Sequence, residues 1–144
     1  MTLRLASIHL YPVKSAAGLS PAEWEVDGFG LRYDRRWMVV DAAGRFVSQR
    51  THPSLALVRP ALGPETLRLE ADGMPALELP LTPMSTALTT VVVWQDACAA
   101  VWLGRHAARW ISDVLHADCD LVFMPASTMR PVDHRYAPPG SRVS

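Results

Sequence analysis

Residues 34–41 read Asp-Arg-Arg-Trp-Met-Val-Val-Asp, and this stretch decides the fold predicted for the chain. Arg36 to Asp41 alternate weakly between apolar and polar side chains, which predicts a short strand. The small residues Ala42 to Gly44 follow as a turn, and Phe46 to Arg50 continue beyond it. The stretch therefore predicts a β-hairpin at this point of the chain.

Short apolar or alternating runs, separated by Gly and Pro turns, lie on both sides of the predicted hairpin. The run 3–13 is strand-like and ends near Pro12, which cannot donate a ladder hydrogen bond. Residues 66–71 alternate clearly, and Asp72-Gly73 marks the turn after them. Other strands are expected at 23–26, 56–62, 77–79 and 90–94, and one helical turn at 52–55. Many short strands at such spacing predict a mostly β protein with a β-barrel-like or sandwich domain.

The pattern changes after Trp94. Residues 104–116 carry apolar side chains at helical spacing, which predicts one helix. Residues 120–124 predict a short strand, and the tail 125–144 has no continuous apolar face. We therefore expect a β-barrel domain over residues 1–94 and the beginning of a second domain over residues 95–144.

Composition restricts the classes of function. A chain of 144 residues can bury a core of its own. Equal numbers of basic and acidic residues, 14 of each, argue against a nucleic-acid partner. No window approaches the ~20 apolar residues of a membrane span, and no signal-peptide pattern precedes the first strand, so we expect a cytoplasmic protein without a membrane partner. Cys98 and Cys119 lack zinc-ligand spacing and are expected to be reduced thiols, with a disulfide as the alternative.

Basic residues stand near the predicted strand ends at two places. The first run ends in Tyr11-Pro-Val-Lys14-Ser15, and Arg35 and Arg36 precede the second strand. Ammonium, hydroxyl and guanidinium donors that converge can hold a phosphate through charge-assisted hydrogen bonds. Adjacent strand residues face opposite sides, so only one of Arg35 and Arg36 should point into such a site. From spacing alone, ordinary surface cations remain the alternative.

Taken together, these motifs resemble the N-terminal β-barrel domain of the MOSC family, which includes the mitochondrial amidoxime-reducing component and its bacterial relatives. The matching elements stand in the family's order, and they are Tyr11 to Ser15, Gly30-Leu31, Asp34 to Trp37, Gly44 to Arg50 and Pro53 to Leu55. A looser likeness covers Val93 to Asp96, Arg109 to Ser112 and Arg130 to Tyr136. The chain departs from the usual pattern at Ala16 and at Arg105-His106. The resemblance implies that residues 95–144 are the truncated start of a MOSC domain.

The resemblance also implies a site. In such proteins a molybdenum cofactor lies between the barrel and the MOSC core, and its phosphate is held by residues that correspond to Lys14, Ser15 and Arg35. Arg36 is the alternative to Arg35, and Arg50 matches a further family arginine. An ion pair of Arg50 with Asp34 or Asp41 is the competing interpretation, and Asp34 is expected to orient a neighbouring arginine.

By the same resemblance, the complete protein would reduce N-hydroxylated compounds with electrons from a flavin or iron–sulfur partner. The molybdenum ligand would be a cysteine of the missing C-terminal MOSC core, and neither Cys98 nor Cys119 matches it. We therefore expect no catalytic residue, no metal ligand and no stably bound cofactor in these 144 residues alone.

A second hypothesis is a non-catalytic module that recognises a partner or a sulfur carrier. MOSC domains also occur as appendages of molybdenum cofactor sulfurases, in which a pyridoxal-phosphate domain does the chemistry, and nothing in the chain resembles that domain. The five tryptophans show no regular spacing for a stacking platform, so we expect them in the core.

Overall fold

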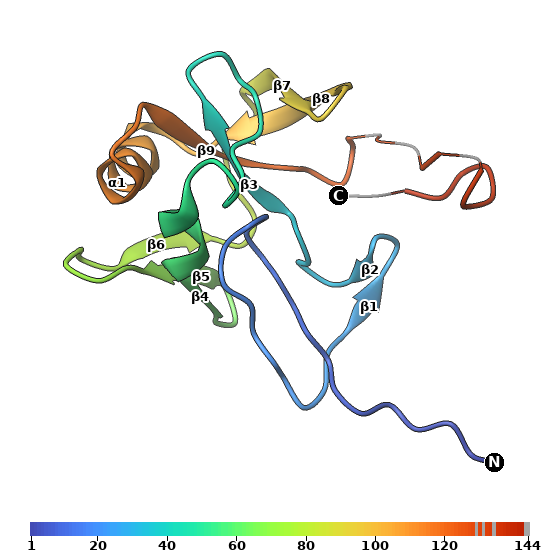
Figure 1. Cartoon of the computed structure of the whole chain (residues 1–144). Coiled ribbons are helices and arrows are strands. Elements are labelled where there is room, and N and C mark those ends of the chain that lie inside the picture. Colours follow the sequence, from blue (N-terminus) through green and yellow to red (C-terminus); the bar gives the residue numbers. More distant parts are fainter. Residues whose placement is uncertain (129, 131, 134, 143–144) are drawn as a thin grey trace.

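The computed structural model describes residues 1–128, 130, 132–133 and 135–142. Figure 1 shows a four-stranded sheet above a three-stranded one, with the helix on one side and both chain ends on the other. The elements are β1 Val26–Asp27, β2 Gly30–Leu31, β3 Trp37–Asp41, the 3-10 helix η1 Pro53–Leu57, β4 Arg59–Leu62, β5 Thr66–Glu70, β6 Leu77–Pro80, β7 Leu88–Val93, β8 Asp96–Trp102, α1 Arg105–Leu115 and β9 Cys119–Phe123. Within the described residues the chain is mostly β with one α-helix and a short last strand, which confirms the predicted fold class.

The four-stranded sheet has the order β3-β9-β8-β7 and is antiparallel throughout. The segment 44–47 then joins its two outer strands. Phe46 bridges to Val40 of β3, and Arg45 bridges to Val92 of β7. The amide of Phe46 donates to the carbonyl of Val92 at 2.8 Å. Because this segment pairs on both sides, it closes the sheet into a small barrel.

Alternate residues of the closed sheet face two different cores. Met38, Val40, Val91, Val93, Ala100 and Val122 form one buried cluster inside the ring of strands. The opposite face carries Trp37, Val39, Leu121 and Phe123, which belong to a larger cluster that includes α1 and the β4-β5-β6 sheet. Full burial of one such aliphatic side chain contributes about 1.5–3 kcal/mol. Strand β3 is therefore buried on both faces, with alternate residues in different clusters.

Helix α1 packs against β9 of the larger sheet and against η1. Its buried stripe is Ala107, Trp110, Ile111 and Leu115, at the spacing of one helix face. The indole N–H of Trp110 donates to the carbonyl of Pro75 at 2.7 Å, which ties the helix to the smaller sheet. The hydroxyl of Ser112 accepts from the amide of Cys119 and donates to its carbonyl, both at 3.0 Å. The helix is thereby fixed to the first residue of β9.

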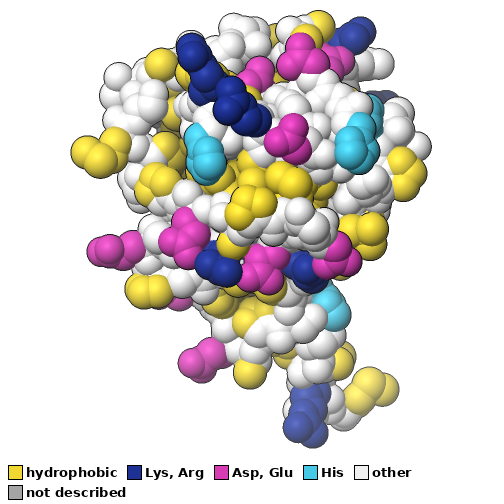
Figure 2. Space-filling model, turned by 90° about the vertical axis from the view of Figure 1, so that its left-hand side faces the viewer, with side chains coloured by type: hydrophobic (Ala, Val, Ile, Leu, Met, Phe, Trp, Pro, Cys, Tyr) yellow, Lys and Arg dark blue, Asp and Glu magenta, His cyan; other side chains and the backbone are white. Residues whose placement is uncertain are grey.

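The outer face of the β4-β5-β6 sheet is covered by ion pairs. Arg68 pairs with Glu70 on its own strand β5 and with Glu78 on β6, and Arg59 of β4 pairs with Asp72. On the face of the molecule in Figure 2, acidic and basic side chains are interspersed. No helix among the described residues has the length and apolar character needed to cross a membrane.

Some sequence predictions fail at the surface. The run 3–13 is not a strand: only Leu10 and Val13 make isolated bridges, and Leu3 and Leu5 are exposed, so the apolar alternation there marks no buried face. The strand expected half-buried at 23–26 is reduced to the exposed β1. Core packing of all five tryptophans is also wrong, because Trp94 and Trp102 are 61% and 39% exposed.

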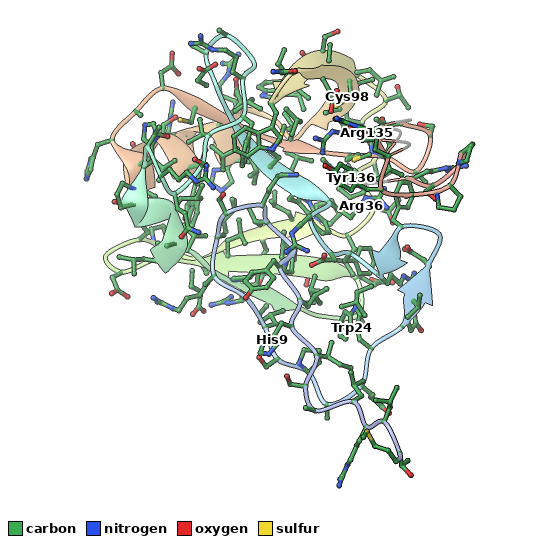
Figure 3. The ribbon with its side chains drawn as sticks, turned by 45° about the vertical axis from the view of Figure 1, so that its right-hand side comes forward. His9, Trp24, Arg36, Cys98, Arg135 and Tyr136 are labelled. Atoms are coloured by element: carbon green, nitrogen blue, oxygen red, sulfur yellow. The ribbon has the colours of Figure 1, made fainter. Side chains whose placement is uncertain are left out.

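Arg36 is a structural arginine. It is 7% exposed, and its Nε donates to the carbonyl of Met124 at 2.9 Å, with Nη2 donating to the same oxygen. The amide of Met124 in turn donates to the carbonyl of Arg36 at 2.8 Å. The guanidinium lies 4.4 Å from the ring centroid of Phe29 and 5.3 Å from that of Phe123. Figure 3 labels Arg36 beside β3, on the side of the chain that follows β9.

Truncation tests how far the folding unit extends. β3 and β7 lie before the division expected at residue 94, whereas β8 and β9 lie after it, and all four share one sheet. A chain ending at residue 94 loses the strands that join β3 to β7. We expect it to show no cooperative urea unfolding by tryptophan fluorescence, whereas a chain ending at residue 130 unfolds cooperatively. A cooperative transition in the shorter chain would contradict this prediction.

Replacing Arg36 by Ala should destabilise the fold, because the Met124 carbonyl loses its charged donor in a buried place. The expected loss is about 2 kcal/mol in the free energy of unfolding. The matched control is Arg35→Ala, at an exposed neighbouring position, with an expected change within about 0.5 kcal/mol. Urea titration of both variants measures the difference, and equal stabilities would argue against the structural role of Arg36.

Candidate anion-binding cleft

A cleft of about 390 Å³ opens near the start of β3 and the end of β7. Four of the five predicted site residues line it, namely Lys14, Ser15, Arg35 and Arg50. The remaining wall is made largely by the aromatic side chains of Tyr11, Phe46 and Trp94. Arg36 does not line this cleft, because its side chain turns toward Met124. Of the two adjacent arginines, the structure directs Arg35 to the cleft.

Backbone pairing brings the two sequence motifs together. The amide of Arg35 donates to the carbonyl of Tyr11 at 2.7 Å, and the amide of Lys14 donates to the carbonyl of Trp37 at 2.8 Å. Val13 forms a parallel bridge with Trp37 in the same place. Lys14 and Arg35 therefore lie at one rim because residues 11–14 run beside residues 35–37.

Three residues of the cleft have left-handed backbone conformations. Ser15, Arg35 and Trp94 have φ of 68°, 51° and 58°. This region is disfavoured for residues other than Gly, Asn and Asp, and it persists where the surrounding structure fixes it. Such residues cluster at ligand sites, and here the geometry turns the chain sharply at three points of one rim.

Each cation of the cleft lies over an aromatic ring. Lys14 Nζ is 5.6 Å from the centroid of Phe46, the Arg35 guanidinium is 5.3 Å from Tyr11, and that of Arg50 is 5.9 Å from Trp94. Phe46 and Trp94 meet edge to face at 5.5 Å. A ring face holds a cation in place without neutralising its charge. The rings therefore orient the three cations along one cleft without reducing their positive charge.

The acidic residues near the cleft have defined partners. Asp34 accepts from the amide of Tyr11 at 2.8 Å and pairs with Arg35, so the prediction that it orients an arginine is confirmed. Asp41 pairs with Arg45 at 3.0 Å. Among the ion pairs of the described residues, neither carboxylate takes Arg50, so the competing interpretation of Arg50 as their partner is wrong.

Lys14 experiences an excess of positive charge. Burial first, and then the charges of Arg130 and Arg35, lower its pKa from 10.5 to about 8, against weaker opposite effects of Cys98 and Asp34. Burial and like charges both disfavour the ammonium form. A bound anion would relieve this repulsion, which makes the cleft suited to a phosphate or a carboxylate.

Sequence reasoning missed two residues of this region. Arg130 contributes to the field at Lys14, and it pairs with Asp96 at 3.0 Å with its side chain 12% exposed. Arg130 belongs to the segment Arg130 to Tyr136, which supports only the family likeness. No local pattern in the sequence predicts that its side chain packs beside Asp96 at the start of β8. Trp94 was expected in the core, but it follows β7 at the two-residue turn into β8 and lines the cleft.

The two cysteines are free thiols, Cys98 half-buried and Cys119 buried, and burial raises the pKa of both. Cys98 borders a small cavity together with Lys14, Arg35 and Arg130. In Figure 3, His9 and Trp24 lie at the opposite end of the molecule from Cys98. The described part of the chain holds no group of three or more His, Cys, Asp or Glu side chains in metal-binding proximity.

Comparison with known proteins identifies relatives of two kinds. The chain is 34% identical to a molybdenum cofactor sulfurase of Danio rerio over 82% of its length, and 36% identical to mitochondrial amidoxime-reducing component 1 of Mus musculus over 91%. It spans only 15% of the sulfurase and 40% of the amidoxime-reducing component.

A solved structure has a similar fold. It is the solution structure of a protein from Bordetella bronchiseptica, with a TM-score of 0.57 and 25% identity. The likeness covers 69% of this chain and 85% of that one. The sequence profile of the MOSC N-terminal beta barrel domain matches residues 2–118, so the chain belongs to the MOSC N-terminal β-barrel family.

Proposed function

We propose that the complete protein is a molybdenum-cofactor oxidoreductase and that this chain forms one wall of the cofactor cleft. The observation that carries the proposal is the set of three cations, Lys14, Arg35 and Arg50, placed around one cleft by aromatic rings. The cofactor in its molybdopterin form carries a phosphate, and a phosphate requires convergent charged donors.

The donor set fits a phosphate rather than a metal. Lys14 offers a compact ammonium, Arg35 and Arg50 offer planar guanidinium groups, and Ser15 offers a hydroxyl from a sharply turned backbone. Asp34 holds Arg35 from the side. These residues would bind and orient the phosphate end of the cofactor, and the rings of Tyr11 and Trp94 would shield that end from water.

When bound, the cofactor supplies two-electron redox chemistry. The thiolate ligand of molybdenum would come from a MOSC core outside these residues, since by the family likeness neither Cys98 nor Cys119 corresponds to that cysteine. We propose N-hydroxylated compounds as substrates and a flavin or iron–sulfur protein as electron donor. The support is the likeness to the amidoxime-reducing component, which extends over 91% of this chain.

A non-catalytic module that recognises a partner or a sulfur carrier is the second candidate. Its support is that this chain covers 85% of a protein solved as a folded chain in solution. The deciding experiment is the molybdenum content of the complete protein, purified from cells that make the cofactor. Near-stoichiometric metal supports the oxidoreductase, and a folded protein without metal supports the module.

Lys14→Ala and Arg35→Ala should each lower the retained molybdenum in that protein about tenfold, because each removes a charge-assisted hydrogen bond. Metal analysis after gel filtration measures the change. Arg105→Ala, at an exposed position of α1, serves as control and should retain the wild-type content. Unchanged metal in both cleft variants would remove these residues from the site.

Binding of an anion should depend on the protonation of Lys14. Since its pKa is lowered to about 8, the ammonium is present below that pH and is lost as the pH rises through it. We expect affinity for sulfate, which keeps its charge throughout, to fall about tenfold between pH 7 and 9.5.

The control for this pH dependence is Lys14→Arg. Its guanidinium stays charged over the whole range, so the variant should bind sulfate equally at both pH values. Calorimetric titration compares the two proteins. An identical pH profile for wild type and variant would assign the titration to another group.

A further inference from the structure

The chain contains 13 arginines and a single lysine, Lys14. Arginine supplies a permanent positive charge, because its guanidinium keeps its proton in proteins. An ammonium differs because it is compact and because it gives up its proton when it is buried or placed near other cations. The one lysine of the chain lies in the cleft that gathers Arg35 and Arg50.

Lys14 lies where the open cleft meets the smaller cavity, because both are lined by it. Its Nζ lies 5.6 Å from the ring centroid of Phe46, and the charged or titratable groups that act on it include Arg35, Arg130, Cys98 and Asp34. Arg36 lines the same small cavity. An amine desolvated among cations is partly unprotonated near neutral pH, and a neutral amine is a nucleophile. At pH 7.5 a pKa of about 8 leaves about a quarter of the amine neutral, against on the order of one in a thousand for an ordinary lysine.

We propose that Lys14 captures a small anionic carbonyl compound, such as a phosphorylated aldehyde, as a reversible imine. The inference rests on the proposed anion site, since Arg35, Arg50 and Ser15 would hold the phosphate while the amine meets the carbonyl carbon. The cleft volume of about 390 Å³ suits a small molecule. Cations outnumber carboxylates around it, which selects negatively charged compounds over neutral ones.

The chemical step needs no oxidant or reductant. The lone pair of Nζ attacks the carbonyl carbon, and a C–N bond forms as the C=O π bond breaks. The oxygen then leaves as water with the two protons of the amine, which gives the imine. Addition of water reverses the reaction and returns the aldehyde.

Trapping with cyanoborohydride tests the proposal on the purified protein. The probe is glycolaldehyde phosphate at pH 7.5, and glycolaldehyde is the uncharged control compound. Peptide mapping distinguishes labelling of Lys14 from labelling of the N-terminal amine. Arg105→Lys provides the control, because it installs an ordinary lysine at an exposed position of α1. We expect Lys14 to be labelled by the phosphorylated probe at least about tenfold faster than that introduced lysine.

Two further measurements test whether the labelling of Lys14 depends on the anion site. Sulfate should slow labelling of Lys14 by the phosphorylated probe more than its labelling by glycolaldehyde, because it competes directly with the phosphate group of the first probe, whereas it slows both reactions by favouring the ammonium form of Lys14. Arg35→Ala should remove most of the preference for the phosphorylated probe while Lys14 still reacts with both compounds.

The outcomes separate this proposal from the anion site. Labelling of Lys14 no faster than the introduced lysine, with sulfate still bound by the protein, would overturn imine capture and leave the anion site standing. Rapid labelling that shows neither a preference for the phosphorylated probe nor competition by sulfate would overturn the anionic class of the ligand and the anion site together.

Discussion

The parallel pairing of residues 11–14 with residues 35–37 is the constraint on which the rest of the structure depends. Three backbone hydrogen bonds, of 2.7, 2.8 and 3.1 Å, hold the first motif against the start of β3. That pairing places Lys14 beside Arg35 at the cleft. It directs the side chain of Arg36 away from the cleft, where its guanidinium donates to the carbonyl of Met124. The cleft and the packing of the chain after β9 thus depend on one short register.

The segment 44–47 has a comparable role on the other side of the barrel. Its pairing with both β3 and β7 closes the sheet, and it carries Phe46 to the place where Lys14 and Trp94 contact it. A Cβ at Gly44 would lie 3.1 Å from the carbonyl oxygen of Thr90, and its φ is 76°, so the turn needs a residue without a side chain. The pairing of segment 44–47 therefore both closes the barrel and places Phe46 in the wall of the cleft.

The sequence predicts the regular parts of the molecule well because their patterns are local. The alternation in β5, the β-branched run of β7 and the helical period of α1 each arise from burial of one face. The run 3–13 misleads, since Leu3 and Leu5 meet no partner strand and remain exposed, and only the end of the run pairs, at Leu10 and Val13. The motifs around Lys14 and Arg35 identify the cleft residues. Trp94 lines the cleft and Arg130 lines the adjacent small cavity through tertiary packing that no local pattern encodes.

The central position of β9 also bears on how the chain is made. β3 pairs on one edge with a strand that ends at Phe123, so that edge stays open until nearly the whole barrel has been synthesised. Contacts between such distant residues form slowly, and open strand edges invite pairing with other chains. The β4-β5-β6 meander pairs only with itself and can form early. A nascent chain would thus hold a finished small sheet beside an unfinished barrel until its last strand is in place.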